Sequence, residues 1–250
     1  MINREQTQAY YANPAQAESF EEKRFYGAFG EWMIEYDVQF YTRNPQVDYS
    51  FCQKILELGC GTGRLTIPFR ERFPDRYLCA VDYSHSMLEQ LRKKRPNKEI
   101  GLEILCNSIE SLSLPDQHFD LVFFSRLLMH LEDWRGALAK SCRLSHRYLL
   151  LDFPPIASIG GLGKFILDRT RHRQTLKDQH RIFRIGAVRS VLQKNGFQII
   201  ALERPLVLPI PLHLKINAIS HSTRLESILG GWGVRGLIGA PVYLVAKRIL

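Results

Sequence analysis

The stretch that most constrains the fold is Ile55–Arg64, which reads Ile-Leu-Glu-Leu-Gly-Cys-Gly-Thr-Gly-Arg. An apolar run ends in three glycines at a spacing of two, and Leu65–Phe69 can then open a helix. Glycine adopts positive φ and lets a ligand touch bare backbone. The free amides at the start of the following helix point toward such a ligand. The pattern therefore predicts a strand, a tight glycine turn and a helix.

Two classes of cofactor site use such a turn. A dinucleotide site requires Gly-x-Gly-x-x-Gly, with a pyrophosphate seated on the helix N-terminus. In this chain the third glycine falls one residue early, and Arg64 occupies the position that needs Gly or Ala. A bulky side chain there would crowd the helix against the strand. The spacing therefore disfavours a nicotinamide oxidoreductase.

The segment Glu57–Gly63, Glu-Leu-Gly-Cys-Gly-Thr-Gly, instead resembles the first motif of the class I methyltransferases that use S-adenosylmethionine. Some twenty residues later, Tyr77–Asp82 reads as a buried strand that ends in an acid. A carboxylate at that strand end can accept both ribose hydroxyls of a nucleoside. Tyr83 and Met87 follow it and can flank an adenine ring, although Met87 fits an ordinary core position equally well.

Two further segments carry the resemblance. Leu102–Cys106 reads as a third strand, and Asn107, Ser108 and Ile109 follow it. In the family the residue at position 107 is usually acidic and accepts the adenine amino group. Here the amide oxygen of Asn107 can still accept, but without charge. The backbone amides of Ser108 and Ile109 can donate to ring nitrogens.

The second segment is Leu114–His130, which is similar to the methyltransferase type 11 pattern L-P-x-x-x-F-D-x-V-x-x-S-x-x-x-x-H. Phe119–Phe124 would be the fourth strand. Open α/β sheets bind ligands beyond the carboxyl ends of their strands. That rule places Ser125, Arg126 and His130 near the sulfonium and the substrate. A capping or core role for His130 is the simpler alternative.

The resemblance covers residues 50–153 and two later strands, Phe197–Glu203 and Val242–Arg248. It implies an α/β fold with a Rossmann-like seven-stranded sheet, order 3-2-1-4-5-7-6, strand 7 antiparallel and helices on both faces. The implied cofactor is S-adenosyl-L-methionine, with S-adenosyl-L-homocysteine as product. Within the class, the chain is most similar to small-molecule type 11 enzymes, which include quinone-biosynthesis methyltransferases. The implied cofactor residues are Glu57, Gly59, Cys60, Gly61, Gly63, Asp82, Tyr83, Met87, Asn107, Ser108, Ile109 and Ser125.

The flanking segments are expected to set the substrate. Residues 1–49 read as helical, and aromatic side chains recur in them at spacings of about three to five, which predicts a buried face. In the family such a segment often closes the cofactor pocket, so Tyr10, Tyr11 and Tyr36 could face the substrate. If the acceptor needs a general base, His130 is the first candidate and Tyr11 the second. We thus expect a lid segment, 1–49, before a cofactor-binding domain, 50–250.

Charge is distributed unevenly along the 250-residue chain. The net charge is +9, but residues 1–155 carry −2 and residues 156–250 carry +11. A basic surface attracts nucleic acid, anionic lipid or acidic substrates, or only aids solubility. Residues 156–189 begin with a glycine-rich loop, 156–163, and continue as a basic stretch that lacks the aromatics of a single-strand binder.

A second insertion, residues 204–241, is apolar and bracketed by prolines. A connection of this length is usually functional. It is expected to roof the substrate pocket or to rest on a membrane surface. The sequence therefore favours a small, apolar or aromatic acceptor, such as a quinone precursor, a lipid or a phenol. An RNA methyltransferase and a non-catalytic cofactor-binding module are the alternatives.

Other features exclude common classes. No apolar run approaches a membrane span, and the N-terminus has no apolar core of the kind a signal peptide needs. Five cysteines, without a Cys-x-x-Cys pair, disfavour a disulfide framework and a structural zinc. No metal site is expected. A cytoplasmic location is the default, with peripheral membrane contact through 156–241 as an option.

Overall fold

The computed structural model describes residues 4–94, 101–170, 180–216, 219–230 and 233–249. Residues 171–179, part of the basic stretch, lie outside these ranges. The chain forms a seven-stranded sheet in the order β3-β2-β1-β4-β5-β7-β6. Strand β7 is antiparallel to both neighbours, and the other pairs are parallel. The expected fold is therefore confirmed, with strands β1 Lys54–Leu58, β2 Tyr77–Asp82, β3 Leu102–Cys106, β4 Phe119–Phe124, β5 Ser145–Phe153, β6 Phe197–Glu203 and β7 Val242–Arg248.

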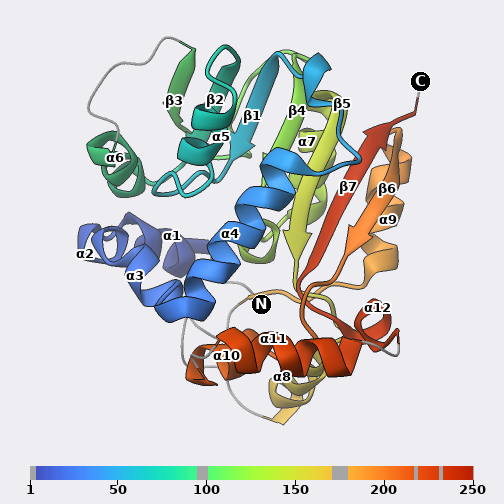
Figure 1. The fold of residues 1–250 in the computed structure, drawn as a ribbon. Helices are drawn as coiled ribbons and strands as arrows, with labels where there is room; N and C mark the ends of the chain where they lie inside the picture. The colour runs from blue at the N-terminus through green and yellow to red at the C-terminus, as the bar shows by residue number, and fades with distance from the viewer. Residues whose placement is uncertain (1–3, 95–100, 171–179, 217–218, 231–232, 250) are drawn as a thin grey trace.

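Helices cover both faces of the sheet (Figure 1). Helices α7 (Trp134–Leu144) and α9 (Ile185–Lys194) pack on one face. Helices α4 (Gly27–Arg43), α5 (Thr66–Arg72) and α6 (His85–Lys94) pack on the other. Because side chains alternate along a strand, each central strand supplies both cores. This burial on both sides explains why the strands read as continuous apolar runs in the sequence.

The first residues form helices, as predicted, and they lie at the carboxyl ends of the parallel strands (Figure 1). Three short helices, α1 (Arg4–Ala12), α2 (Pro14–Glu18) and α3 (Phe20–Arg24), precede α4. Two single 3-10 turns, η1 (Tyr49–Phe51) and η2 (Leu128–His130), flank strands β1 and β4.

The loop predicted at 156–163 is wrong in its second half. Helix α8 (Ile159–Thr170) begins there, despite three glycines that disfavour a helix. The Ser158 hydroxyl accepts a hydrogen bond from the Gly161 amide at 2.9 Å, which caps the first turn. A Cβ at Gly161 would lie 2.2 Å from the Pro155 carbonyl oxygen. Gly161 therefore serves a close approach of two backbone segments, which the sequence alone does not reveal.

The insertion at 204–241 folds as three helices, α10 (Ile210–Ile216), α11 (Ile219–Gly230) and α12 (Val234–Ile238). Helices α10 and α11 pack on α4. They lie with α8 at one end of the molecule, below the carboxyl end of β5 in Figure 1. None of the helices in the described ranges combines the length and the hydropathy that crossing a membrane requires.

Candidate functional site

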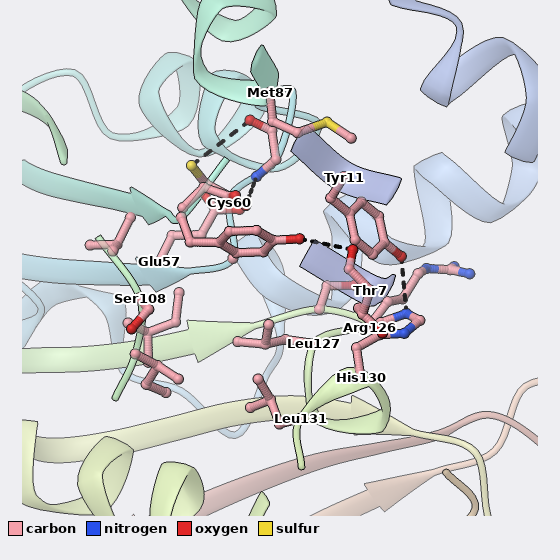
Figure 2. A pocket seen from close by; sticks show the side chains of 18 of the residues that line it. Thr7, Tyr11, Glu57, Cys60, Met87, Ser108, Arg126, Leu127, His130 and Leu131 are labelled. Atoms are coloured by element: carbon pink, nitrogen blue, oxygen red, sulfur yellow. Dashed lines mark hydrogen bonds between the residues drawn. The ribbon is translucent and has the colours of Figure 1, made fainter. Parts of the chain in front are cut away.

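A cavity lies where β1, β2 and β4 end, and residues of α1 and α3 line it as well. Figure 2 shows Tyr11 and Thr7, from α1, beside the residues that follow the strands. Every residue that the sequence nominated for cofactor binding or catalysis lines this cavity, apart from Gly63. Of the three tyrosines expected to face the substrate, Tyr11 lines it, whereas Tyr10 and Tyr36 do not. Parallel strands bring these residues together because their carboxyl ends meet at one edge of the sheet. Positions that are up to 119 apart along the chain thus share one wall.

The glycine turn has the predicted conformation. Gly59, Gly61 and Gly63 have φ of 68°, 55° and 85°. A Cβ at Gly61 would meet nothing within 4 Å, so backbone is exposed toward the cavity at that point. A Cβ at Gly63 would lie 2.3 Å from the Leu91 Cδ1, on α6. Gly63 therefore allows the turn to pack on α6, and Gly59 allows it to approach Leu127, whose Cδ1 would lie 3.0 Å from a Cβ there, whereas Gly61 leaves main chain facing the cavity.

Asp82 is held rigidly at the tip of β2. Its Oδ2 accepts a hydrogen bond from the Gly61 amide at 2.9 Å, and its Oδ1 accepts one from the Ser84 amide at 2.8 Å. Burial raises the pKa of Asp82, and these amides act in the opposite direction. Each carboxylate oxygen accepts more than one hydrogen bond. Both can therefore still receive a hydroxyl from the cavity side, which is the geometry that a ribose diol needs.

Glu57 is the other carboxyl group of this wall. It is buried, and its Oε2 accepts a hydrogen bond from the Thr66 hydroxyl at 2.6 Å. Burial raises the pKa of Glu57 to about 8, against the opposing effects of Thr66 and Arg64. The group is therefore mostly protonated at pH 7, and a cationic amine placed beside it would ionise it.

Tyr11 and His130 meet across the cavity mouth, as Figure 2 shows. The Tyr11 hydroxyl lies 3.2 Å from the His130 Nε2, and it accepts a hydrogen bond from the Arg24 guanidinium at 3.0 Å. Burial raises the pKa of Tyr11. Burial, with the charge of Arg24, lowers the pKa of His130 to about 3. His130 is therefore neutral near pH 7, and its Nε2 can accept a hydrogen bond from the Tyr11 hydroxyl.

The other nominated residues of the cavity, Asn107, Ser125 and Met87, have contacts of their own. The Asn107 side-chain oxygen accepts a hydrogen bond from the Ser111 hydroxyl at 2.5 Å. The Ser125 hydroxyl accepts one from the Arg64 guanidinium at 3.1 Å. Met87 is fully buried beside the cavity, so it serves the core as well as the cavity wall.

Helix α1 is tied to the start of α6. The Ser84 hydroxyl donates to the Tyr11 carbonyl at 2.6 Å, and the Ser86 hydroxyl donates to the Ala12 carbonyl at 2.8 Å. The Tyr83 hydroxyl reaches the Thr7 carbonyl at 3.3 Å, across the cavity. The two serine bonds satisfy carbonyl groups at the end of α1 that lack partners within the helix. They fix α1 as a cover over the cavity.

Sequence reasoning missed a buried charge cluster next to the cavity. Asp37, on α4, has no exposed surface, and its Oδ2 pairs with the Arg64 guanidinium at 2.5 Å and with that of Arg126 at 2.9 Å. Both guanidinium groups also lie over the Phe25 ring, at 4.8 and 4.9 Å from its centroid. The Tyr243 hydroxyl donates to Asp37 as well.

Burial alone would raise the pKa of Asp37, but the charges of Arg126 and Arg64 lower it below its usual value. The two arginines line the cavity, so the cluster presents guanidinium groups to it. No local pattern marks the cluster, since Asp37 lies 27 and 89 positions from these partners.

Within the described ranges, no three His, Cys, Asp or Glu side chains gather in a way that would hold a metal ion. All five cysteines are free.

Known proteins share this chain's central segment. Residues 55–146 match the model of a family described as a methyltransferase domain. The chain is 28% identical to the demethylmenaquinone methyltransferase of Deinococcus radiodurans, over 74% of this chain and 73% of that protein. It is 41% identical over 68 residues to the malonyl-[acyl-carrier protein] O-methyltransferase of Priestia megaterium, which is 24% of that protein. A match of 33% identity to the corresponding protein of Bacillus cytotoxicus spans 30% of it.

Solved structures share the fold over almost the whole chain. The magnesium protoporphyrin IX methyltransferase of Synechocystis PCC 6803, solved with bound SAH, superimposes with a TM-score of 0.66 at 14% identity. The match covers 99% of this chain and 100% of that one. The plantazolicin methyltransferase, also solved in complex with SAH, gives a TM-score of 0.62 at 13% identity, over 99% and 95% of the two chains. At these identities the likeness concerns the fold.

Proposed function

Because the chain belongs to the class I S-adenosylmethionine-dependent methyltransferases, we propose that it transfers a methyl group to a small, apolar or aromatic acceptor. A quinone precursor, a lipid or a phenol has this chemistry. One observation supports the proposal above all. The bare backbone at Gly61 donates a hydrogen bond of 2.9 Å to the carboxylate of Asp82, and both residues line the same cavity.

The residues of the cavity fit the cofactor along its length. Asp82 would receive the ribose hydroxyls, and Tyr83 and Met87 would flank the adenine beside Asn107 and Ile109. The glycine backbone would lie along the methionine portion, with Glu57 close to its amino group. Arg64 and Arg126 offer guanidinium groups for the carboxylate at that same end, because both line the cavity.

The acceptor would enter beneath α1. This part of the cavity is formed by Tyr11, Phe20, Leu127 and Leu131, which are aromatic or aliphatic. Such walls favour an apolar body with few polar groups. The relatives agree with this choice, since one of them is a demethylmenaquinone methyltransferase and a structural neighbour is a magnesium protoporphyrin IX methyltransferase. We accordingly assign residues 1–49 as the lid and residues 50–250 as the catalytic domain.

S-adenosylmethionine, when bound, supplies a methyl group that its sulfonium already activates. The protein therefore has mainly to align donor and acceptor and to exclude water, which can account for several kcal/mol of the barrier. A phenolic or enolic acceptor must also lose a proton. Neutral His130 can accept a hydrogen bond at Nε2, either directly from the acceptor hydroxyl or from the Tyr11 hydroxyl. With a pKa of about 3, His130 is a weak base, so we expect it to orient the acceptor hydroxyl, whose proton passes to solvent water.

A label-transfer assay tests the proposal. The protein is incubated with S-adenosylmethionine that carries a radioactive methyl group and with fractionated cell extract, and the organic, RNA and protein fractions are counted. We expect label in the organic-soluble fraction, lost in Asp82→Ala and retained in Asp116→Ala, an exposed acid outside the cavity. Label in RNA would favour the alternative that the basic second half suggests, and cofactor binding without any transfer would favour a non-catalytic module.

A further inference from the structure

Helix α11 buries two polar side chains and exposes two large apolar ones. An ordinary surface helix buries its apolar side chains and exposes its polar ones. On α11, Ser222 and Glu226 are only 1% and 4% exposed, whereas Leu225 and Ile228 are 40% and 61% exposed. The side chains of Leu225 and Ile228 therefore point to the surroundings.

This orientation is fixed by the contacts of the inner face. The Glu226 carboxylate accepts hydrogen bonds from the backbone amides of Val207 and Leu208, at 2.7 and 2.9 Å. It also lies 2.9 Å from the Nε2 of the buried His213. Rotating α11 to bury Leu225 and Ile228 would break all three bonds. The two backbone amides would then lack a hydrogen-bond acceptor. These contacts thus fix the outward position of Leu225 and Ile228.

Neighbouring helices extend this face. Of the ten large apolar side chains that are exposed among the described residues, seven lie on α8, α10, α11 and α12. Leu237 on α12 is 72% exposed, and the exposed side chains of α8 recur at a helical spacing. These seven residues, which we call the apolar end, are Ile159, Leu162, Phe165, Leu212, Leu225, Ile228 and Leu237.

The four helices are joined in space as well. A Cβ at Gly160, on α8, would lie 3.9 Å from Pro209, at the start of α10. Helix α11 packs on both α10 and α12. Figure 1 shows the four helices together at one end of the molecule, away from β1 and the turn that precedes it.

The exposed charges on α10 and α11 have one sign. Lys215 and Arg224 are exposed, and Arg235 is half-buried. Glu226 is the one acidic side chain in the described parts of α10, α11 and α12, and it is buried, while the sequence of α8 holds one acid, Asp168, beside Lys164 and Arg169. Two copies of this surface would bring like charges together, which disfavours self-association. An anionic partner with an apolar interior matches both properties.

We propose that the apolar end is a docking surface for an anionic lipid bilayer. Helices with outward aliphatic and aromatic side chains, bordered by Lys and Arg, lie in the membrane interface and insert shallowly. Each basic residue near an anionic surface strengthens binding by about fivefold at low salt. A nucleic acid does not match, because six of the seven outward side chains are aliphatic and offer bases no stacking surface. The proposal does not depend on the reaction at the cavity.

Vesicle sedimentation tests this surface. The full chain is mixed with phosphatidylcholine vesicles that either contain or lack phosphatidylglycerol, and bound protein is measured in the pellet at low and high salt. We expect binding only where phosphatidylglycerol is present, and a decrease as salt rises. The pair Leu225→Gln with Ile228→Gln should weaken binding by about tenfold or more, since it removes outward apolar groups. The pair Lys215→Glu with Arg224→Glu should weaken it by at least as much.

Phe51→Gln is the matched control. Phe51 is 56% exposed but lies on η1, at the opposite end of the sheet, so its substitution should leave vesicle binding unchanged. Circular dichroism confirms that each variant is folded. The proposal is overturned if the wild type ignores phosphatidylglycerol vesicles or if Phe51→Gln weakens binding as much as the α11 pair does. A salt-insensitive dimer that the α11 pair dissociates, with no vesicle binding, would instead assign the surface to a second copy.

Discussion

At the scale of single residues, Glu57 is a buried acid whose proton depends on its surroundings. Its pKa in the folded protein is about 8, whereas an exposed Glu titrates near 4.3. A group whose pKa is raised by folding stabilises the protein fully below its unfolded value, and this contribution is lost as the pH rises through the folded value. The contribution of Glu57 to the free energy of unfolding therefore decreases progressively as the pH rises from about 4 to about 8.

Replacing Glu57 by Gln should remove this dependence. The variant keeps a side-chain oxygen for the Thr66 hydroxyl but cannot ionise. We expect the difference in unfolding free energy, variant minus wild type, to rise by up to a few kcal/mol from about pH 5 to pH 8. Urea denaturation of both proteins over this range measures it. Parallel pH profiles would show that Glu57 ionises normally.

At the scale of elements, the Asp37 cluster ties four segments together. Asp37 comes from α4, Arg64 from the glycine turn, Arg126 from the end of β4 and Tyr243 from β7. The charged groups are shielded from water, so removing one of them leaves the others without compensation. This cluster explains how α4 holds both the cavity wall and the edge of the sheet.

Asp37→Asn tests that role. It keeps the shape of the side chain but leaves two guanidinium groups without their carboxylate. We expect a loss of about 3–5 kcal/mol in the unfolding free energy. Asp116→Asn, at an exposed pair with Arg143, should cost less than about 1 kcal/mol. Equal losses in the two variants, measured by urea denaturation, would mean that the cluster is not a structural centre.

The elements also show what local sequence can and cannot predict. Strand β2 ends where the apolar run reaches Asp82, and β4 ends before Ser125, because a strand buried on both faces leaves a continuous apolar signature. Helix α8 was missed because glycines at 160, 161 and 163 suggested a loop. The Ser158 cap and the approach to Pro155 that justify the helix are contacts between segments, and composition does not record them.

On the scale of the whole molecule, the cavity could be largely predicted because its residues follow strand ends, and the sheet order brings those ends together. What escaped prediction is long-range: Asp37 finds its partners only through the packing of α4. The orientation of α11 could not be predicted for a similar reason, since the Glu226 carboxylate accepts hydrogen bonds from backbone amides of another segment. Residues that follow the end of a strand can thus be predicted from local sequence. Residues whose partners lie in distant segments cannot.

Calorimetric titration with S-adenosylhomocysteine tests most directly whether the backbone at Gly61 and the carboxylate of Asp82 hold the cofactor. We expect the wild type and Asp116→Ala to give saturable heat for one site. Asp82→Ala should bind about tenfold or more weakly, since it loses charged hydrogen bonds to the ribose. Absence of heat from the folded wild type, or equal affinity in Asp82→Ala, would contradict this assignment.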